Sequence, residues 1–215
     1  MALLREEVNQ MWQLVLSQLE KSKQALLDLD PELAHEVMAR EKRVDTFELK
    51  IGSDCENYIA LYNPVAVDLR LVLALTRICG TLERIGDFAE GIARFVLENT
   101  CSAMIRRLKE PLQLEKMFGK VISMLSDCFV ALESENTKIA GKILLKDEVV
   151  DELYAKSMDV LAAHVATHPA DAACALKTMI VIRKIERVGD HCSNIVEEIV
   201  FYVDAKVLKH QAKKQ

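Results

Sequence analysis

Four pairs of acidic residues, each an Asp or Glu followed four positions later by Asp, could carry out chemistry in this chain. They are Glu41/Asp45, Glu83/Asp87, Asp147/Asp151 and Glu186/Asp190. On a helix this spacing puts both carboxylates on one face, where two like charges cost a few tenths of a kcal/mol, about 0.2–0.5. Such a face favours a neutralising proton or cation. Carboxylate oxygens are the ligands that hard cations such as iron, manganese, magnesium and calcium prefer.

The four pairs occupy equivalent positions in two similar halves of the chain. Residues 83–87 read Glu-Arg-Ile-Gly-Asp, and the same pattern recurs 103 residues later as Glu-Arg-Val-Gly-Asp at 186–190. Val-Asp at 44–45 recurs 106 residues later at 150–151. An internal repeat of this size indicates two copies of one structural unit. We therefore predict two domains, residues 1–105 and 106–215.

The elements that must position these pairs are predicted to be helices. Apolar residues make up 51% of the chain, whereas there are only seven Gly and four Pro. So few turn residues argue against an all-β fold. The prolines and a soft break near residue 134 divide the chain into segments with helical apolar spacing, three in each half. The six expected helices are 3–28, 31–62, 64–99, 111–133, 136–166 and 169–205.

Antiparallel helices would bring the acidic pairs of each half to the same height. Asp45 and Glu83 lie 18 residues before Asn63 and 19 residues after Pro64, at the turn between their helices. In the second half, both distances from the turn at His168-Pro169 are 17 residues. At 1.5 Å per residue, this height is about 27 Å from the turn. Since packed helix axes lie roughly 8–10 Å apart, four carboxylates can converge in each half.

The spacing alone leaves other interpretations open. The acids could form solvated helix faces with Arg84 and Arg187 as ion-pair partners. Gly86 and Gly189, each costing about 1 kcal/mol relative to Ala inside a helix, could allow close helix packing or leave room for a metal. His191 follows Asp190 directly and could be a ligand or contact one.

Several classes of protein are disfavoured by composition and motifs. A net charge of −5 argues against a nucleic-acid-binding protein. The chain shows no secretory leader and no apolar run near the roughly 20 residues of a membrane span, so we expect a cytoplasmic protein. The six cysteines lie in apolar runs without a C-x-x-C pair, which is not the pattern of a disulfide scaffold or zinc ribbon. No P-loop or Ser-His-Asp arrangement is present, and we predict no catalytic residues.

The longer motifs resemble the PhoU family. Residues 63–70 (Asn-Pro-Val-Ala-Val-Asp-Leu-Arg), 82–87 (Leu-Glu-Arg-Ile-Gly-Asp) and 185–195 (Ile-Glu-Arg-Val-Gly-Asp-His-Cys-Ser-Asn-Ile) carry the similarity. It extends over essentially the whole chain, including the two-repeat layout. The resemblance implies an all-α fold of two pseudo-symmetric three-helix bundles, with six helices and no enzymatic activity.

The resemblance also implies a function in bacterial phosphate homeostasis. It suggests a negative regulator of phosphate uptake and phosphate-starvation signalling. Such a protein couples the ATPase subunit of the phosphate ABC transporter to a sensor histidine kinase, as a homodimer that reaches the membrane only through its partners. Two alternatives stay open: an accessory protein of another phosphate carrier, and an enzyme that uses carboxylate-bridged metals.

Finally, the resemblance implies that the acidic pairs hold metal clusters of iron or another divalent transition metal. The implied ligands are Glu41, Asp45, Glu83, Asp87, Asp147, Asp151, Glu186 and Asp190. Four further residues are expected to contact these ligands: His191, Asn194, Arg84 and Arg187. The family motif usually continues Asp-His-x-x-Asn, which the second copy keeps, whereas the first copy has Phe88 and Gly91. The resemblance therefore supports the second metal site more strongly than the first.

Overall fold

The computed structural model describes residues 1–206, and all regular elements in this part of the chain are helices. Its α-helices are α1 (Ala2–Asp28), α2 (Pro31–Tyr62), α3 (Ala66–Glu98), α4 (Ser102–Leu108), α5 (Leu114–Glu133), α6 (Ala140–Thr167) and α7 (Ala172–Asp204). Short 3-10 helices, η1 (Thr137–Ile139) and η2 (Pro169–Asp171), precede α6 and α7. Residues 1–206 contain no strand, so the predicted all-α class is confirmed. Residues 207–215 of the second predicted domain lie outside the described part.

All six predicted helices are present; their ends agree with the prediction within one residue, and the larger differences lie at their starts. Asp30 caps α2 as expected for a residue before Pro31, because its side chain accepts hydrogen bonds from the backbone of Glu32 at 2.8 Å and Leu33 at 3.2 Å. By contrast, the α-helix expected from residue 169 begins only at Ala172, after the turn of η2. Helix α4 was not predicted, because seven residues are too few to show an apolar period.

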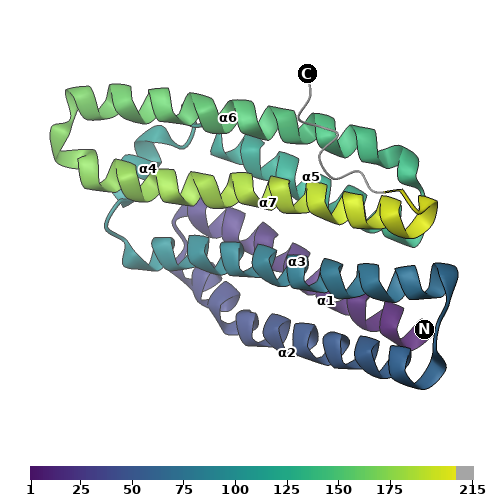
Figure 1. The fold of residues 1–215 in the computed structure, drawn as a ribbon. Helices are drawn as coiled ribbons and strands as arrows, with labels where there is room; N and C mark the ends of the chain where they lie inside the picture. Colours follow the sequence, from purple (N-terminus) through teal and green to yellow (C-terminus); the bar gives the residue numbers. More distant parts are fainter. Residues whose placement is uncertain (207–215) are drawn as a thin grey trace.

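The long helices form two three-helix bundles, α1–α3 and α5–α7, that pack through α3 and α7 (Figure 1). Within each bundle the second and third helices form an antiparallel hairpin. The two hairpin turns lie at opposite ends of the molecule (Figure 1). This arrangement is the pseudo-symmetry that the resemblance implied.

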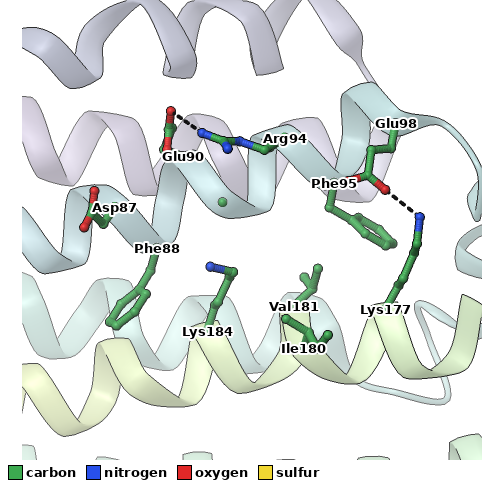
Figure 2. A pocket seen from close by; sticks show the side chains of 11 residues that line it. Asp87, Phe88, Glu90, Arg94, Phe95, Glu98, Lys177, Ile180, Val181 and Lys184 are labelled. Carbon is green, nitrogen blue, oxygen red and sulfur yellow. Dashed lines mark hydrogen bonds and ion pairs between the residues drawn. The ribbon is translucent and has the colours of Figure 1, made fainter.

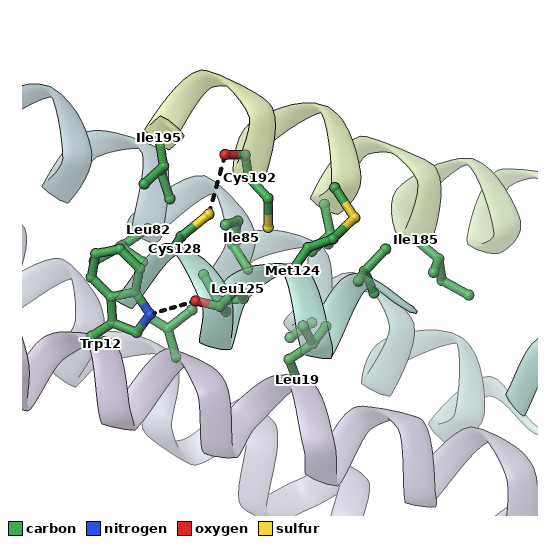
Figure 3. Close-up of a cluster of buried hydrophobic side chains, with 14 of the residues drawn as sticks. Trp12, Leu19, Leu82, Ile85, Met124, Leu125, Cys128, Ile185, Cys192 and Ile195 are labelled. Carbon is green, nitrogen blue, oxygen red and sulfur yellow. Dashed lines mark hydrogen bonds between the residues drawn. The ribbon is translucent and has the colours of Figure 1, made fainter. Parts of the chain in front are cut away.

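One apolar core joins the two bundles (Figure 3). Trp12 of α1 is fully buried and donates its indole N–H to the carbonyl of Leu125 on α5, at 3.3 Å. Cys128 of α5 lies against α7, with its sulfur 3.4 Å from the carbonyl oxygen of Cys192. Since buried side chains of both bundles interlock, α3 and α7, which carry the Glu-Arg-x-Gly-Asp motifs, are held by a close-packed interior.

The cysteines differ in part from the expectation. Cys55, Cys79, Cys128 and Cys192 are free and buried, as small apolar side chains are. Cys101, just after α3, forms a disulfide with Cys174 in the first turn of α7. The sequence did not predict this bond, because two cysteines 73 residues apart carry no spacing signal.

None of the helices in residues 1–206 combines the length and the apolar character that a membrane span requires.

Candidate functional site

The structure places the acidic pairs of each half on facing helices, those of the first half on α2 and α3 and those of the second half on α6 and α7. We call Glu41, Asp45, Glu83 and Asp87 the first acidic cluster. We call Asp147, Asp151, Glu186 and Asp190 the second acidic cluster. In both, carboxylates from different helices are close enough to raise one another's pKa. The acids of each half therefore lie on facing helices within electrostatic reach of one another.

Glu41 is the buried member of the first acidic cluster. Only 8% of its surface is exposed. Its Oε2 accepts a hydrogen bond from Nε2 of Gln18 at 3.0 Å, whereas its Oε1 is buried without a hydrogen-bond partner. Burial raises the pKa of Glu41 to about 7; the bond from Gln18 opposes the rise, and the charges of Asp87 and Asp45 add to it. This carboxyl is therefore only partly ionised near neutral pH unless a cation approaches it.

Asp147 has the same position in the second acidic cluster. The hydroxyl of Ser193 donates to its Oδ2 at 2.8 Å, and its Oδ1 is buried without a hydrogen-bond partner. Burial raises the pKa of Asp147 to about 6, the bond from Ser193 lowers it, and Asp151 and Asp190 raise it further. Each cluster thus has one buried carboxyl with one unsatisfied oxygen.

The two glycines of the repeated motif make room for these buried carboxyls. A Cβ on Gly189 would lie only 2.6 Å from Oδ1 of Asp147, and one on Gly86 would lie 3.3 Å from Oε1 of Glu41. Glycine therefore allows close helix approach and, at the same time, admits the carboxyl of the neighbouring helix. The first interpretation drawn from the sequence, close helix packing, is therefore confirmed, and the space beside each glycine is taken by a carboxyl of the neighbouring helix.

The arginines of the motif lie beside the clusters. Burial is the main cause that raises the pKa of Glu83 and of Glu186; neighbouring carboxylates add to it, and Arg84 and Arg187 respectively oppose it. Arg187 also donates to Asp190 at 3.2 Å. The charges of the two arginines thus balance part of the negative charge, and Arg187 forms an ion pair, but the pKa values of Glu83 and Glu186 are still raised.

Two acids that the sequence reasoning missed lie near the first acidic cluster. Glu48 raises the pKa of Glu83, and Glu90 raises the pKa of Asp87. They follow Asp45 and Asp87 by three positions, a spacing that shares a helix face and could have revealed them. The second acidic cluster lacks them, because Tyr154 and Ser193 occupy the equivalent positions.

His191 and Asn194 lie at the contact between the two halves. The imidazole of His191 is buried and stacks on the ring of Phe88, with centroids 5.3 Å apart and planes inclined by 17°. Asn194 lies on the same helix, with its Nδ2 3.4 Å from Nδ1 of His191. Burial is the main cause that lowers the pKa of His191 to about 4, and the charges of Arg187 and Arg84 lower it further. The imidazole is therefore neutral at physiological pH.

The donor set of the clusters suits a hard cation. All eight candidate ligands are carboxylates, and Glu41 and Asp147 each keep one unsatisfied buried oxygen. Within residues 1–206, however, no three His, Cys, Asp or Glu side chains are close enough together to hold one ion. Cation binding would therefore require the exposed carboxylates of Asp45, Asp87 and Asp151 to turn towards the buried ones.

A groove of about 460 Å³ between α3 and α7 adjoins the first acidic cluster (Figure 2). Asp87 lies at one end. Arg94 pairs with Glu90 at 2.9 Å, and Lys177 pairs with Glu98 at 2.7 Å. Both acidic and basic side chains line this groove, so it does not carry charge of a single sign.

Comparison with known proteins identifies related chains. The family model described as the PhoU domain matches residues 8–96 and again residues 114–199. A "phosphate-specific transport system accessory protein PhoU homolog" of Aquifex aeolicus is 33% identical over 207 residues, covering 96% of this chain and 92% of the relative. The "phosphate-specific transport system accessory protein PhoU" of Escherichia coli is 32% identical over 209 residues, covering 96% and 85%.

Solved structures show the same architecture. PhoU from Pseudomonas aeruginosa superposes with a TM-score of 0.83 at 26% identity, covering 94% of this chain and 96% of that one. The "phosphate transport system regulatory protein PhoU" from Streptococcus pneumoniae gives a TM-score of 0.83 at 28% identity, covering 96% of both chains. These names describe accessory and regulatory proteins, not enzymes, in agreement with the prediction of no catalytic activity.

Proposed function

This chain belongs to the PhoU family, and from that premise we propose that it is an accessory protein of a phosphate-specific transport system. It restrains phosphate uptake and represses the phosphate-starvation response when phosphate is plentiful. The observation that carries this proposal is the match of the PhoU domain to both halves of the chain, residues 8–96 and 114–199. Relatives aligned over 96% of the chain are named for the same transport system.

The proposed partners are the ATPase subunit of the phosphate ABC transporter and the sensor histidine kinase of the phosphate response. The protein acts in the cytoplasm as a homodimer and reaches the membrane through these partners. Coupling transport to signalling requires that one partner alter the affinity for the other, which needs two states of the bundle with different affinities. The names of the E. coli and S. pneumoniae relatives, an accessory and a regulatory protein of phosphate transport, support such a function.

The two acidic clusters are proposed to bind iron or another divalent transition metal. The support comes from their all-carboxylate composition and from the unsatisfied buried oxygens of Glu41 and Asp147. When bound, a metal would supply the positive charge that the buried carboxyls lack. The chain's own contribution is to hold α2 against α3 and α6 against α7, so that carboxylates from two helices face one cation.

Deletion of the gene tests the regulatory proposal. In phosphate-rich medium the deletion should derepress phosphate-scavenging genes, and the intact gene should restore repression. Expression that stays phosphate-responsive in the deletion strain contradicts the proposal. The same deletion in a strain without the ABC transporter is the control: an effect that persists there assigns the protein to a different phosphate carrier.

Direct binding tests the partners. The purified chain should bind the isolated ATPase subunit and the cytoplasmic part of the kinase, and light scattering should give the mass of a dimer. Metal content should be measured on protein purified without chelators, beside an Asp87→Asn/Asp190→Asn variant. Metal that is present in the parent chain and lost in the variant supports the acidic clusters as its site.

A further inference from the structure

Lys184 of the second repeat reaches across to the first repeat and ends over Gly91, in the groove that Asp87 of the first acidic cluster also lines (Figure 2). It lies on α7, and its side chain covers Gly91 of α3. A Cβ on Gly91 would lie 2.5 Å from the Nζ atom of Lys184 and 2.8 Å from its Cε. The ammonium is also 5.9 Å from the ring centroid of Phe88. The missing side chain at position 91 is therefore what makes room for this cation.

The positive charge of Lys184 lies near the first acidic cluster and is not neutralised by an ion pair with a described carboxylate. Among the described residues it has no carboxylate oxygen within 4.0 Å, whereas Arg94 and Lys177 in the same groove are paired with Glu90 and Glu98. Lys184 and Asp87 line the same groove between α3 and α7. Lys184 thus contributes a long-range positive charge to a cluster on the other repeat.

The second acidic cluster has no counterpart of this cation. At the offset of 103 residues, Gly91 corresponds to Asn194 and Lys184 corresponds to Thr81. Thr81 is neutral, and its hydroxyl donates to the carbonyl oxygen of Arg77 at 2.8 Å. Arg84 and Arg187 occupy equivalent positions in the two halves, so they cannot account for a difference in metal affinity between the two clusters. The charges around the two clusters therefore differ: Lys184 lies near the first, whereas Arg183, at the position equivalent to Gly80, acts on Glu186 of the second.

We propose that Lys184 is a built-in counter-cation of the first acidic cluster and lowers the affinity of that cluster for divalent metal ions. The inference rests on the proposed metal binding. It also rests on the buried, unsatisfied Oε1 of Glu41, which marks this cluster as short of positive charge. A tethered ammonium and a metal ion bound nearby repel each other, so the ammonium lowers the affinity for the metal. At surface dielectric, one charge several ångströms away changes the affinity for a divalent ion roughly three- to tenfold.

The experiment measures Mn²⁺ binding to the full chain by the electron paramagnetic resonance signal of free Mn²⁺. The background is Asp151→Asn/Asp190→Asn, which leaves the first acidic cluster as the site observed. Lys184→Gln should tighten Mn²⁺ binding roughly three- to tenfold. Lys177→Gln is the matched control, because it removes the same charge from the same groove at a position paired with Glu98. Its affinity should equal that of the background.

A reciprocal variant tests the same idea at the other site. In an Asp45→Asn/Asp87→Asn background, Thr81→Lys combined with Asn194→Gly grafts the ammonium and its space onto the second acidic cluster. Mn²⁺ binding there should weaken by a similar factor, whereas Asn194→Gly alone should not weaken it to this extent. Thermal unfolding followed by circular dichroism confirms that each variant is folded.

The outcomes separate this inference from the proposed function. Equal Mn²⁺ affinity in the Lys184→Gln and Lys177→Gln variants overturns the inference but leaves metal binding intact. No Mn²⁺ binding by the unmodified chain or by any variant overturns both. Tighter binding in Lys184→Gln together with weaker binding in the grafted variant establishes Lys184 as the counter-cation.

Discussion

Phe88 and His191, which stand at equivalent positions 103 residues apart, stack directly on each other. When two equivalent residues are in contact, they lie beside the axis that relates the two halves. The interface of α3 and α7 is therefore centred on this pair, and the two acidic clusters flank it.

The pH dependence of stability should reveal the buried imidazole. The pKa of His191 falls from 6.5 to about 4 on folding, so the unfolded chain binds a proton more readily. The native state should keep the full contribution of this group above pH 6.5. It should lose about 3 kcal/mol of stability from this group as the pH falls from 6.5 through 4. Because Glu41 changes stability in the opposite direction over this range, the contribution of His191 is measured by urea unfolding of the parent chain and of a variant without the imidazole at pH 7 and pH 4.5.

Replacing this imidazole by a ring that does not titrate provides the matched comparison. His191→Phe should flatten the acid side of the stability profile, because Phe can stack on Phe88 without a proton. His35→Phe changes an exposed histidine on α2 and should leave the profile of the parent chain unchanged. If the free energy of unfolding falls equally steeply at low pH in His191→Phe and in the parent chain, the pH dependence does not come from His191.

Glu41 should give a pH dependence of the opposite sign in metal-free protein. Its pKa rises from 4.5 to about 7 on folding, so its favourable contribution is present below pH 4.5 and is lost as the pH rises through 7. Glu41→Gln keeps an acceptor for Gln18 and removes the buried charge. In the presence of EDTA it should stabilise the protein by about 2 kcal/mol at pH 8 and by little at pH 4.5.

The control for this effect is an exposed glutamate of the same helix. Glu32→Gln at the start of α2 should change the free energy of unfolding by less than about 0.5 kcal/mol at either pH. A Glu41→Gln variant that is less stable than the parent chain at pH 8 would show that the carboxylate is already neutralised in the metal-free state.

The sequence predicted the features that follow from local pattern. Pro31 and the turn at Asn63-Pro64 marked helix boundaries, because proline restricts its own backbone and that of the residue before it. The expectation that Asp45 and Glu83 lie at the same height on their helices followed from the constant rise of a helix. These predictions need only the helical spacing of apolar residues and the positions of the helix breaks. Both can be read from the sequence, which is why the predictions agree with the structure.

Features that depend on the packing of one repeat against the other were not predicted. Lys184 reaches the first acidic cluster only because α7 packs on α3 and Gly91 leaves space. The Cys101–Cys174 disulfide arises from the same packing. Counting along one chain segment cannot show which side chains meet across this interface. The buried position of His191 was missed for this reason, since its neighbour Asp190 is charged and gives no sign of burial.

The disulfide predicts a count of reactive thiols. Protein denatured without a reductant should show four thiols per chain, from Cys55, Cys79, Cys128 and Cys192, and protein denatured after reduction should show six. Because the bond closes a loop of 73 residues, its reduction should cost roughly 2–4 kcal/mol of stability. A Cys101→Ser/Cys174→Ser variant should resemble the reduced chain. Six thiols before reduction would contradict the bond.

Substitution by alanine should have different effects at a glycine with open space around it and at the two glycines of the repeated motif. Gly119→Ala, within α5 and with no neighbour inside 4 Å, should stabilise the protein by up to about 1 kcal/mol, because alanine is the better helix former. Gly189→Ala brings a Cβ to 2.6 Å from Oδ1 of Asp147, whose carboxyl is also bonded to Ser193, so this variant should lose about 1–3 kcal/mol. Gly86→Ala, at 3.3 Å from Glu41, should lie between the two.

The double variant Gly189→Ala/Asp147→Ala decides whether the carboxyl causes the loss at Gly189. Removing the Asp147 side chain removes both the clash and a buried carboxyl that lacks one hydrogen-bond partner. The double variant should therefore be more stable than Gly189→Ala alone, with a coupling energy of about 1 kcal/mol or more in a double-mutant cycle from urea unfolding. Additive effects would mean that α6 and α7 shift apart to admit the methyl group, and that the glycine is not needed to seat the carboxyl.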